Sequence, residues 1–571
     1  MKLKNICITT LVLFFLSCSS NTKKEKTQTR EPVMEDVDEP VKDTKQAKKV
    51  TDRDYSITAE NAYNDIFLDS LAMEKYITGH ELGDKKIGLR IRSFYNARNY
   101  QYAWFSSKGL TEQTRFFWNQ YDYAVTHLKD TTLANSDFYK HAEKLVNQEE
   151  ITFNKKDTNL LNSEFAFTEN FIRYINSTYE KGYVKRKEQE KFIPIKKLAP
   201  LEMADSLLNK KHSDDKYYEE VNDMYAGLKK VLQLYYTVAR AGGWPVIPPT
   251  KASLKKGDSQ PSVPAIKKRL QLTEDMAGND STAFFTDTLE LAVKRFQTRH
   301  GYKADGVITG QLIKDMNVPA KERLKEILLN MDRMRWMPQK PTGNLIIVNI
   351  PEFILHVMDG KKKVFDMVVV VGQVGHNTMM FNGDLNQVIF SPYWNIPQSI
   401  IKSEIMPAIK RNPNYLANKN MEQIGANIRQ KPGPGNALGK VKFIFPNSFN
   451  MYFHDTPAKS LFGQDKRAFS HGCVRLSEPQ KMAEWLLRND QAWPKEKIVR
   501  AMNQTHETSV KLKEPVPVFI IYYTAWVDGD GQLNFRDDVY EHDKELMKKM
   551  FMPDQVIGLI RVDNMRVFVL K

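Results

Sequence analysis

The most informative stretch of this chain is Ser470-His471-Gly472-Cys473-Val474-Arg475-Leu476-Ser477. It holds one of only three cysteines, and the other two, Cys7 and Cys18, lie in an N-terminal segment typical of an export signal. Upstream runs Tyr452-Phe453-His454-Asp455-Thr456-Pro457, with fifteen residues between the histidine and Ser470. A thiol attacks as its thiolate, and a nearby imidazole is the usual means of forming one near neutral pH. A lone buried cysteine needs no such histidine, so the combined pattern favours a nucleophile over a structural residue.

Other stretches extend the pattern beyond the cysteine. They are Arg429-Gln430-Lys431-Pro432-Gly433-Pro434-Gly435-Asn436-Ala437-Leu438-Gly439, Lys442-Phe443 and Ala525-Trp526-Val527-Asp528. Together with His-x15-Ser-His-Gly-Cys-x-Arg they resemble the signature of the L,D-transpeptidases, the cysteine enzymes that cross-link bacterial peptidoglycan. The likeness is to the large, multidomain members of that family.

The resemblance and the residue types together predict a site. Cys473 would be the nucleophile, His454 would take its proton to give a thiolate–imidazolium pair, and the Gly472-Cys473 turn would supply backbone N–H groups for the oxyanion. The predicted substrate-binding residues are Arg475, Ser470, His471 and Tyr452. His471 is a weaker candidate for an essential role than His454. Arg475 shares a face with Cys473 if this segment is a strand, where it would either bind substrate or support the loop. Asp455 would point away from His454, so a backbone carbonyl is expected to orient the imidazole.

The N-terminus predicts where the protein works. Lys2 and Lys4 precede an apolar run from Ile6 to Leu16, which reads as a secretory signal over residues 1–17 and is too short for an ordinary membrane span. The run then meets Cys18 in a loose lipoprotein processing box, so lipidation of Cys18 is expected, with simple cleavage and secretion as the alternative. The predicted location is the periplasm, on the inner or outer membrane.

Composition narrows the partners. The formal net charge is +15, which favours anionic wall polymers or membrane surfaces. No nucleic-acid partner is expected, since an exported protein seldom meets nucleic acid. No cofactor is expected, and a metal site is not predicted because the eleven histidines show no ligand-like spacing. The expected ligands are peptidoglycan stem peptides and glycan.

The fold class predicted for the whole chain is α+β and multidomain. A tether over residues 18–52, poor in apolar residues, is followed by a helical scaffold domain over 53–250 with helices at Phe165–Lys181 and Tyr217–Arg240. Residues 251–319 resemble a small three-helix peptidoglycan-binding module, on the evidence of Ala292-Val293-Lys294-Arg295-Phe296-Gln297 and Asp305-Gly306-Val307. The aromatic residues between Tyr95 and Trp118 are interpreted as core.

A connecting helix is expected over 320–340 and leads into a mostly β catalytic domain over 341–528. In that domain β-rich runs at Leu345–Met358 and Val364–Val371 are joined by Asp359-Gly360, a hairpin signal. A helical lid is expected over about 395–440, and a C-terminal extension over 529–571.

Several functions fit this pattern. The favoured one is an L,D-transpeptidase that forms a cysteine thioester with a stem tetrapeptide and releases the terminal D-amino acid. With water as acceptor the same site would be an L,D-carboxypeptidase, and with a protein lysine it would anchor proteins to the wall. A non-catalytic wall-binding lipoprotein and a thiol protease acting on ordinary peptides are further alternatives. The joint presence of His454, Cys473 and Arg475 favours an enzyme.

Overall fold

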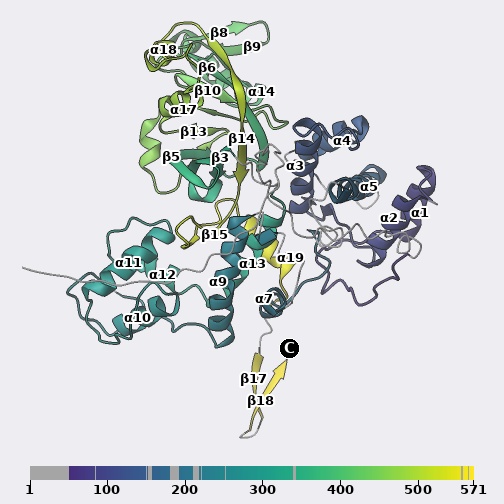
Figure 1. The fold of residues 1–571 in the computed structure, drawn as a ribbon, viewed down its shortest axis with the longest axis vertical. Coiled ribbons are helices and arrows are strands. Elements are labelled where there is room, and N and C mark those ends of the chain that lie inside the picture. Colours follow the sequence, from purple (N-terminus) through teal and green to yellow (C-terminus); the bar gives the residue numbers. More distant parts are fainter. Residues whose placement is uncertain are drawn as a thin grey trace, which may run out of the picture. The chain divides into compact units, whose positions relative to one another are not determined.

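The structure is a computed structural model that describes residues 50–83, 85–148, 151, 157–180, 192–209, 218–219, 222–250, 252–337, 343–553, 557–562 and 565–570. The chain separates into two units, Met1–Lys49 and Val50–Lys571, and the account below concerns the second (Figure 1). The predicted signal peptide, the lipidation site Cys18 and the tether as far as residue 49 lie outside the described residues. In the part of the chain that is described, no helix is both long and apolar enough to cross a membrane.

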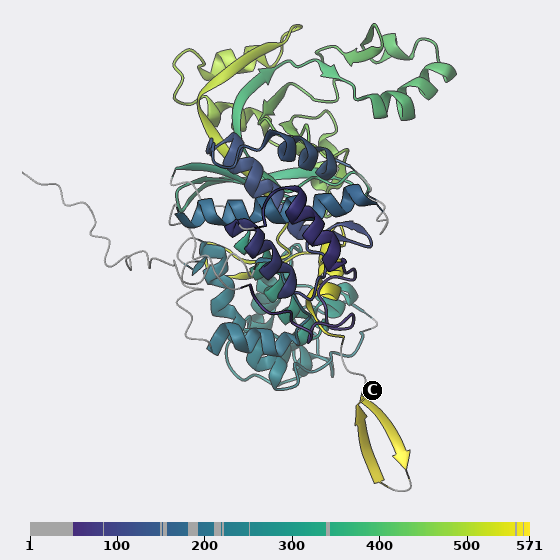
Figure 2. The same ribbon diagram turned by 90° about the vertical axis from the view of Figure 1, so that its right-hand side faces the viewer.

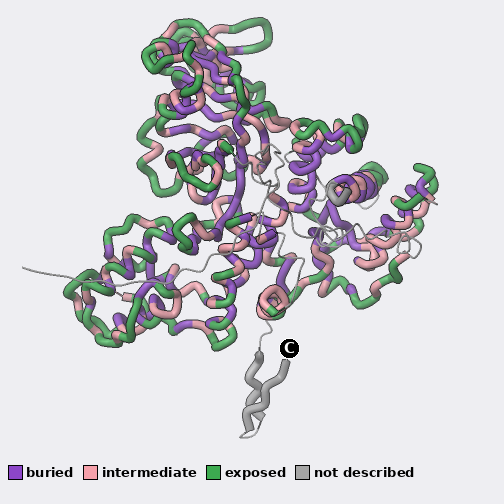
Figure 3. The backbone as a smooth tube through the Cα atoms, viewed as in Figure 1, coloured by how far each residue is buried: buried purple, intermediate pink, exposed green. Residues whose placement is uncertain are grey.

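The first region of this unit is helical, as predicted. Its helices are α1 Ser70–Gly79, α2 Lys86–Asn96, α3 Glu112–Thr126, α4 Ser136–Val146, α5 Thr158–Glu180, α7 Pro200–Asn209 and α9 Asp223–Arg240, with a short hairpin β1 Phe105–Ser106 and β2 Gly109–Leu110. Thr111 caps α3, because its hydroxyl accepts the Thr114 N–H at 3.3 Å. Trp104, Phe117 and Phe171 are buried and stack edge-on or tilted, which confirms the interpretation of the aromatic residues as core. Figure 3 shows that α3 is buried along much of its length.

The next region is a three-helix unit. It consists of α10 Val263–Leu272, α11 Asp287–Arg299 and α12 Gly310–Met316, and it has a separate hydrophobic core that includes Ile266, Val293 and Phe296. The prediction of a small three-helix module is confirmed at the level of fold. Helix α13, Ala320–Arg335, follows directly, as expected for the connecting helix.

The mostly β region forms a sheet in the order β12-β5-β13-β11-β10-β6-β14-β3-β4. Its strands are β3 Asn344–Asn349, β4 Ile354–Asp359, β5 Lys362–Gly372, β6 Phe381–Phe390, β10 Val441–Ile444, β11 Tyr452–His454, β12 Ala468–Ser470, β13 Val474–Leu476 and β14 Thr508–Ile521. A further pairing of β4 with β5 closes the sheet on itself. Helices α17 Pro479–Leu486 and α18 Lys495–Ala501 contribute Met482 and Ile498 to its core.

One predicted strand run was wrong in detail. The run Leu345–Met358 is two antiparallel strands, β3 and β4, separated by a 3-10 turn at Ile350–Glu352. Pro351 lacks an N–H for the ladder, and Phe353 adopts a left-handed conformation with φ 59° that reverses the chain. The hairpin signal at Asp359-Gly360 was right, since Gly360 turns the chain from β4 into β5 with φ 57°.

The segment predicted to be a lid, called the lid below, forms an insertion with its own small core. It comprises β7 Trp394–Asn395, α14 Gln398–Ile400, the π-helix Ile401–Ile405, α15 Met406–Arg411, α16 Tyr415–Asn418, β8 Met421–Ile424 and β9 Asn427–Gln430. The helical part comes first, as expected, and a three-stranded sheet β7-β9-β8 that was not predicted follows. The core is made of isoleucines such as Ile400, Ile405 and Ile428. In Figure 2 this green segment extends away from the main sheet at the upper right.

The last helix packs on the helical region. A hairpin of β15 Ala525–Val527 and β16 Leu533–Phe535 leads to α19 His542–Met550, and a last hairpin pairs β17 Ile557–Val562 with β18 Met565–Leu570. Leu546 and Met550 of α19 join the core of the helical region. The predicted boundary at residue 528 therefore falls in the turn of the β15–β16 hairpin, and the residues after it contribute to a shared core.

Candidate active site

Strand β11 carries the predicted base, and the predicted nucleophile Cys473 directly precedes the neighbouring strand β13. Strands β11 and β13 run parallel, with Phe453 opposite Val474 and His454 opposite Arg475. Successive side chains of a strand point to opposite faces. Phe453 and Val474 are fully buried in the core of the sheet, so Tyr452, His454, Cys473 and Arg475 belong to the other face. This register brings the predicted site residues together from two separate parts of the sequence.

The thiol of Cys473 is a neutral group at rest. Burial raises its pKa, whereas hydrogen bonds from the backbone and hydroxyl of Tyr452 and the charge of Arg475 partly lower it, and the net shift is upward. Burial and the neighbouring thiol in turn raise the pKa of the Tyr452 hydroxyl. The Tyr452 hydroxyl and the Cys473 thiol are therefore close enough for each to affect the pKa of the other.

His454 is also neutral. Burial, followed by the charge of Arg475, lowers the pKa of its imidazole to about 4. Its Nδ1 lies 2.5 Å from the carbonyl oxygen of Asp455. A carbonyl only accepts, so Nδ1 carries the proton and Nε2 is left as the basic nitrogen. The expectation that a backbone carbonyl orients this imidazole is confirmed.

The Asp455 side chain serves the local backbone. Its carboxylate accepts the N–H of Lys440 at 2.8 Å and the Nζ of Lys459 at 2.6 Å. It lies against Gly439, where an added Cβ would come within 2.4 Å of the carboxylate carbon. Asp455 thus ties the end of the lid insertion to strand β11.

Ser470 and Gly472 shape the turn before the nucleophile. The Ser470 hydroxyl donates to the Cys473 carbonyl at 2.6 Å and accepts the Gly472 N–H at 3.1 Å. Gly472 has φ 109°, a conformation that other residues rarely adopt. The Gly472 N–H is therefore engaged within the turn, so its contribution is backbone shape. Ser470 is buried and holds the turn.

Two residues that sequence reasoning missed support this turn from behind. The Thr378 hydroxyl donates to the Gly472 carbonyl at 2.7 Å and accepts the Gly372 N–H at 2.8 Å. The Tyr540 hydroxyl accepts the Thr378 N–H at 3.2 Å and donates to the Gly372 carbonyl at 2.7 Å. Neither residue belongs to a local motif, because only the sheet topology brings them to the turn.

His471 faces the lid. Its side chain is 43% exposed, and its Nε2 lies 3.2 Å from the Glu404 carboxylate of the lid. The His376 ring lies 5.0 Å from it, between ring centroids. The structure thus places His471 at the entrance of the site and next to the lid.

Two cations flank the base. Arg475 is opposite His454 on β13, and Lys442 is opposite it on β10. The Nε of Arg475 is buried and has no hydrogen-bond partner among the described residues. Burial lowers the pKa of both Arg475 and Lys442. The sequence indicated Lys442 only as part of a motif. Its position opposite His454 in the β10–β11 ladder places it beside the site.

The fold and the site define a class of protein: a helical scaffold joined to a β-rich domain in which a half-buried thiol and a neutral imidazole share one sheet face. Residues 343–516 match the family model of the L,D-transpeptidase catalytic domain named YkuD, and residues 90–232 match a model described as a scaffold domain. The chain is therefore multidomain, and its β-rich region matches the YkuD L,D-transpeptidase catalytic domain.

One curated relative is a putative L,D-transpeptidase of Haemophilus influenzae, 28% identical over 243 residues, or 39% of this chain. The match spans about half of that relative, 49% of its length. Among solved structures, L,D-transpeptidases from Stackebrandtia nassauensis and Xylanimonas cellulosilytica each cover 48% of this chain and 97% and 100% of their own. Their identities are 15% and 13% and their TM-scores 0.21 and 0.16, so the family assignment rests on the models.

Proposed function

We propose that this protein is an L,D-transpeptidase that forms peptidoglycan cross-links through a thioester on Cys473. The observation that carries the proposal is the β11–β13 register. It sets Cys473 and His454 on one face and leaves Nε2 of His454 as the basic nitrogen. The catalytic-domain match over residues 343–516 supports the choice of reaction.

The first half of the reaction is acylation. The Cys473 sulfur attacks the carbonyl carbon of the third residue of a tetrapeptide stem. The proton of the thiol passes to Nε2 of His454. The pKa of His454 is lowered and the pKa of Cys473 is raised, so a resting thiolate–imidazolium pair is disfavoured. The proton is therefore transferred during the attack. The C–N bond then breaks, the leaving D-amino acid takes the proton from His454, and the thioester remains.

The second half transfers the acyl group. An amine of a neighbouring stem attacks the thioester carbonyl, gives a proton to His454, and forms the new amide bond. The C–S bond breaks, and the proton on His454 returns to Cys473. The site thus returns to its resting state, with a neutral Cys473 thiol and a neutral His454 imidazole.

The remaining site residues have supporting roles in this proposal. With the Gly472 N–H held by Ser470, the Cys473 N–H is the better donor for the oxyanion. The Tyr452 hydroxyl, close to the sulfur, stabilises its developing charge. Arg475, with its unpartnered Nε, binds a substrate carboxylate or carbonyl, and His471 contacts substrate beneath the lid.

The cellular setting is part of the proposal. The N-terminal segment would direct export and lipidation at Cys18, which would tether the enzyme to a membrane facing the wall. A lid over residues 395–440 and a wall-binding module over residues 251–319 are proposed with it.

Intact-mass spectrometry tests the proposal. The full chain is incubated with a carbapenem, and then with disaccharide-tetrapeptide, beside a Cys473→Ala variant. The expected result is a stoichiometric adduct on the unmodified chain only, and a product with the mass of a dimer less one D-alanine. Loss of D-alanine without a dimer would indicate a carboxypeptidase. No adduct and no turnover would overturn the enzymatic proposal.

A further inference from the structure

A cavity lies behind the catalytic turn, on the side of the helical region. Its volume is about 800 Å³, within the range typical of ligand sites. Hairpin β1–β2 and α3 form one wall, the loop between β5 and β6 a second, and α19 a third. It reaches the turn at His471 and Gly472, next to the nucleophile, while Cys473 does not line it. A ligand held here would therefore be a part of the substrate remote from the bond that breaks.

The walls of this cavity are fastened to one another by buried polar contacts. Arg333 of α13 donates to Glu112 of α3 at 2.7 Å and to Asp543 of α19 at 2.5 Å. Asn119 of α3 donates to the carbonyl of Met380, in the loop before β6, at 2.7 Å. These contacts join elements that are far apart in sequence, so the cavity is formed before a ligand arrives.

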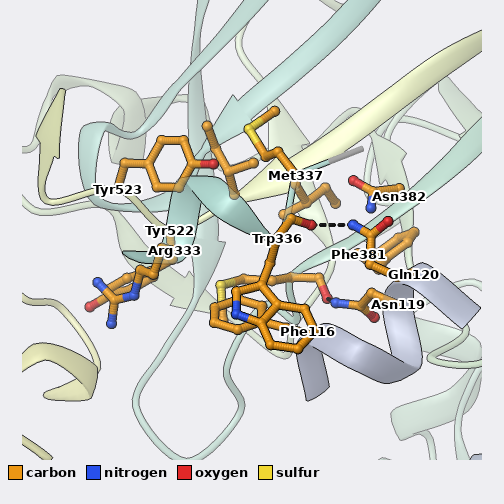
Figure 4. A pocket seen from close by; sticks show the side chains of 13 residues that line it. Phe116, Asn119, Gln120, Arg333, Trp336, Met337, Phe381, Asn382, Tyr522 and Tyr523 are labelled. Carbon is orange, nitrogen blue, oxygen red and sulfur yellow. Dashed lines mark hydrogen bonds between the residues drawn. The ribbon is translucent and has the colours of Figure 1, made fainter. Parts of the chain in front are cut away.

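Figure 4 shows the contact between α3 and the residues that follow α13. Gln120 of α3 donates to the backbone carbonyl of Trp336, drawn as a dashed line, and Phe116 stacks on the Trp336 ring with centroids 5.9 Å apart. The residues drawn enclose a void of only about 30 Å³, room for about one water molecule. This small void is part of the joint, whereas the larger cavity has the volume of a ligand site.

The charge in the larger cavity is unbalanced. Its carboxylates are already used, since Glu112 pairs with Arg333, and Glu545 pairs with Lys108. Two further cations, Arg115 and Lys549, form no ion pair with a carboxylate among the described residues. Arg115 donates to the carbonyl of Val146 at 3.2 Å.

These two cations are partly withdrawn from water. Burial lowers the pKa of the Arg115 guanidinium against the opposing charge of Glu112. It also lowers the pKa of the Lys549 ammonium, against the opposing charges of Asp65, Glu112 and Glu545. Removing a cation from water without pairing it is unfavourable, and an incoming anion would relieve that cost. The cavity thus combines volume, rigidity and unpaired positive charge beside the catalytic turn.

We propose that this cavity binds a carboxylate-bearing segment of a peptidoglycan stem peptide, with Arg115 and Lys549 as the residues that hold its carboxylates. The inference rests on the proposed function and adds to it a subsite built by the scaffold and the C-terminal helix. Stem peptides are carboxylate-rich, and the segment would pass the turn at His471 to present its reacting group to Cys473. Donor and acceptor stems share this chemistry, and the experiment separates them.

Binding is measured first, without turnover. Disaccharide-tetrapeptide is titrated by calorimetry into the full chain carrying Cys473→Ala, alone and with Lys549→Gln or Arg115→Gln. The expected result is binding about tenfold weaker for each lost cation, the size typical of a charged hydrogen bond. The same ligand with amidated carboxylates should bind the parent about as weakly as the acid binds the variants. Lys548→Gln is the matched control, since this exposed neighbour pairs with Glu545 and does not line the cavity.

Turnover then assigns the stem. With Cys473 intact, slower thioester formation in Lys549→Gln would identify the donor stem, and a raised KM for the acceptor with unchanged acylation would identify the acceptor stem. Unchanged binding of acid and amide by both cavity variants would overturn the inference even if cross-linking is observed. Charge-dependent binding without any acylation would instead keep the cavity and overturn the proposed reaction. Lys549→Gln keeps the test valid if Arg115→Gln does not fold.

Discussion

Among the histidines that contact carboxylates, one lies within the catalytic sheet and one where the catalytic turn meets the lid. These two contacts differ in how far they are buried. On the sheet, His356 of β4 lies between Glu352 at 3.0 Å and Asp366 at 2.8 Å, with its side chain 19% exposed. At the lid, His471 meets Glu404 at 3.2 Å, and both side chains are about half exposed. Burial strengthens such contacts and water screens them. The sheet is therefore expected to hold its groups in place, and the lid contact to open and close easily.

The largest effect is expected at the buried base. His454→Gln should lower kcat/KM by about 10²–10⁴-fold, because the proton of Cys473 loses its acceptor. His454 is neutral above its pKa of about 4, so the activity of the parent should fall as pH drops through 4. Rates of carbapenem acylation between pH 3 and 8 would measure both.

The matched control for this change is His471→Gln, which removes the exposed histidine of the lid contact. It should leave the acid limb in place and change the rate by only a few fold. Equal losses in the two variants would remove the proposed distinction between the buried and the exposed histidine.

The contacts of His356 with Glu352 and Asp366 should make the stability of the protein depend on pH. The pKa of His356 is raised to about 9 by its hydrogen bonds to Asp366 and Glu352, against the opposing effect of burial. Its contribution is fully present below the unfolded pKa of about 6.5 and is lost as pH rises through 9. The loss should reach about 2–3 kcal/mol in thermal unfolding between pH 6 and 10. In His356→Gln this slope should be absent, and an unchanged slope would contradict the assignment.

The chain of hydrogen bonds behind the catalytic turn can be broken at Tyr540. Tyr540→Phe leaves the Thr378 N–H and the Gly372 carbonyl without their shared partner, at a cost of about 1–3 kcal/mol in stability. Since Thr378 also holds the Gly472 carbonyl, the acylation rate should fall about tenfold. Stopped-flow acylation and chemical denaturation would measure the two effects.

A tyrosine of the lid offers the comparison. Tyr415→Phe removes a hydroxyl from the small lid core and should change neither quantity by more than a few tenths of a kcal/mol. If it lowers the acylation rate as much as Tyr540→Phe does, the hydrogen bonds from Tyr540 through Thr378 to Gly472 have no specific effect on the catalytic turn.

The smallest effect is expected at the lid contact. Glu404→Gln removes the carboxylate from an exposed contact with His471, and such exposed contacts contribute about 0–1 kcal/mol. Stability should be unchanged, and KM for tetrapeptide should shift no more than a few fold, less so at high salt. A large loss of acylation would show that Glu404 acts in the site itself.

The sequence predicted much of this molecule from local patterns. Periodicity placed α5 and α9, Asp359-Gly360 marked the hairpin, and the motif around Cys473 indicated both the nucleophile and its distant base. The prediction from sequence was wrong or incomplete where the hydrophobic pattern does not mark the ends or the pairing of strands. The turn at Ile350–Glu352 splits an apolar run that is continuous in hydrophobicity, and the strands of the lid are short segments whose pairing is set by the fold.

The sequence by itself determined which groups can do chemistry here, because a thiol and an imidazole at a fixed spacing are properties of the chain. Their ionisation was decided by the tertiary structure. Burial and the charge of Arg475 make His454 neutral, and burial makes Cys473 a neutral thiol, so the predicted resting ion pair gives way to proton transfer during attack. Packing likewise brought Thr378, Tyr540 and the cations Arg115 and Lys549 to the catalytic turn. Contacts between residues hundreds of positions apart depend on sheet register and helix packing, which no local pattern encodes.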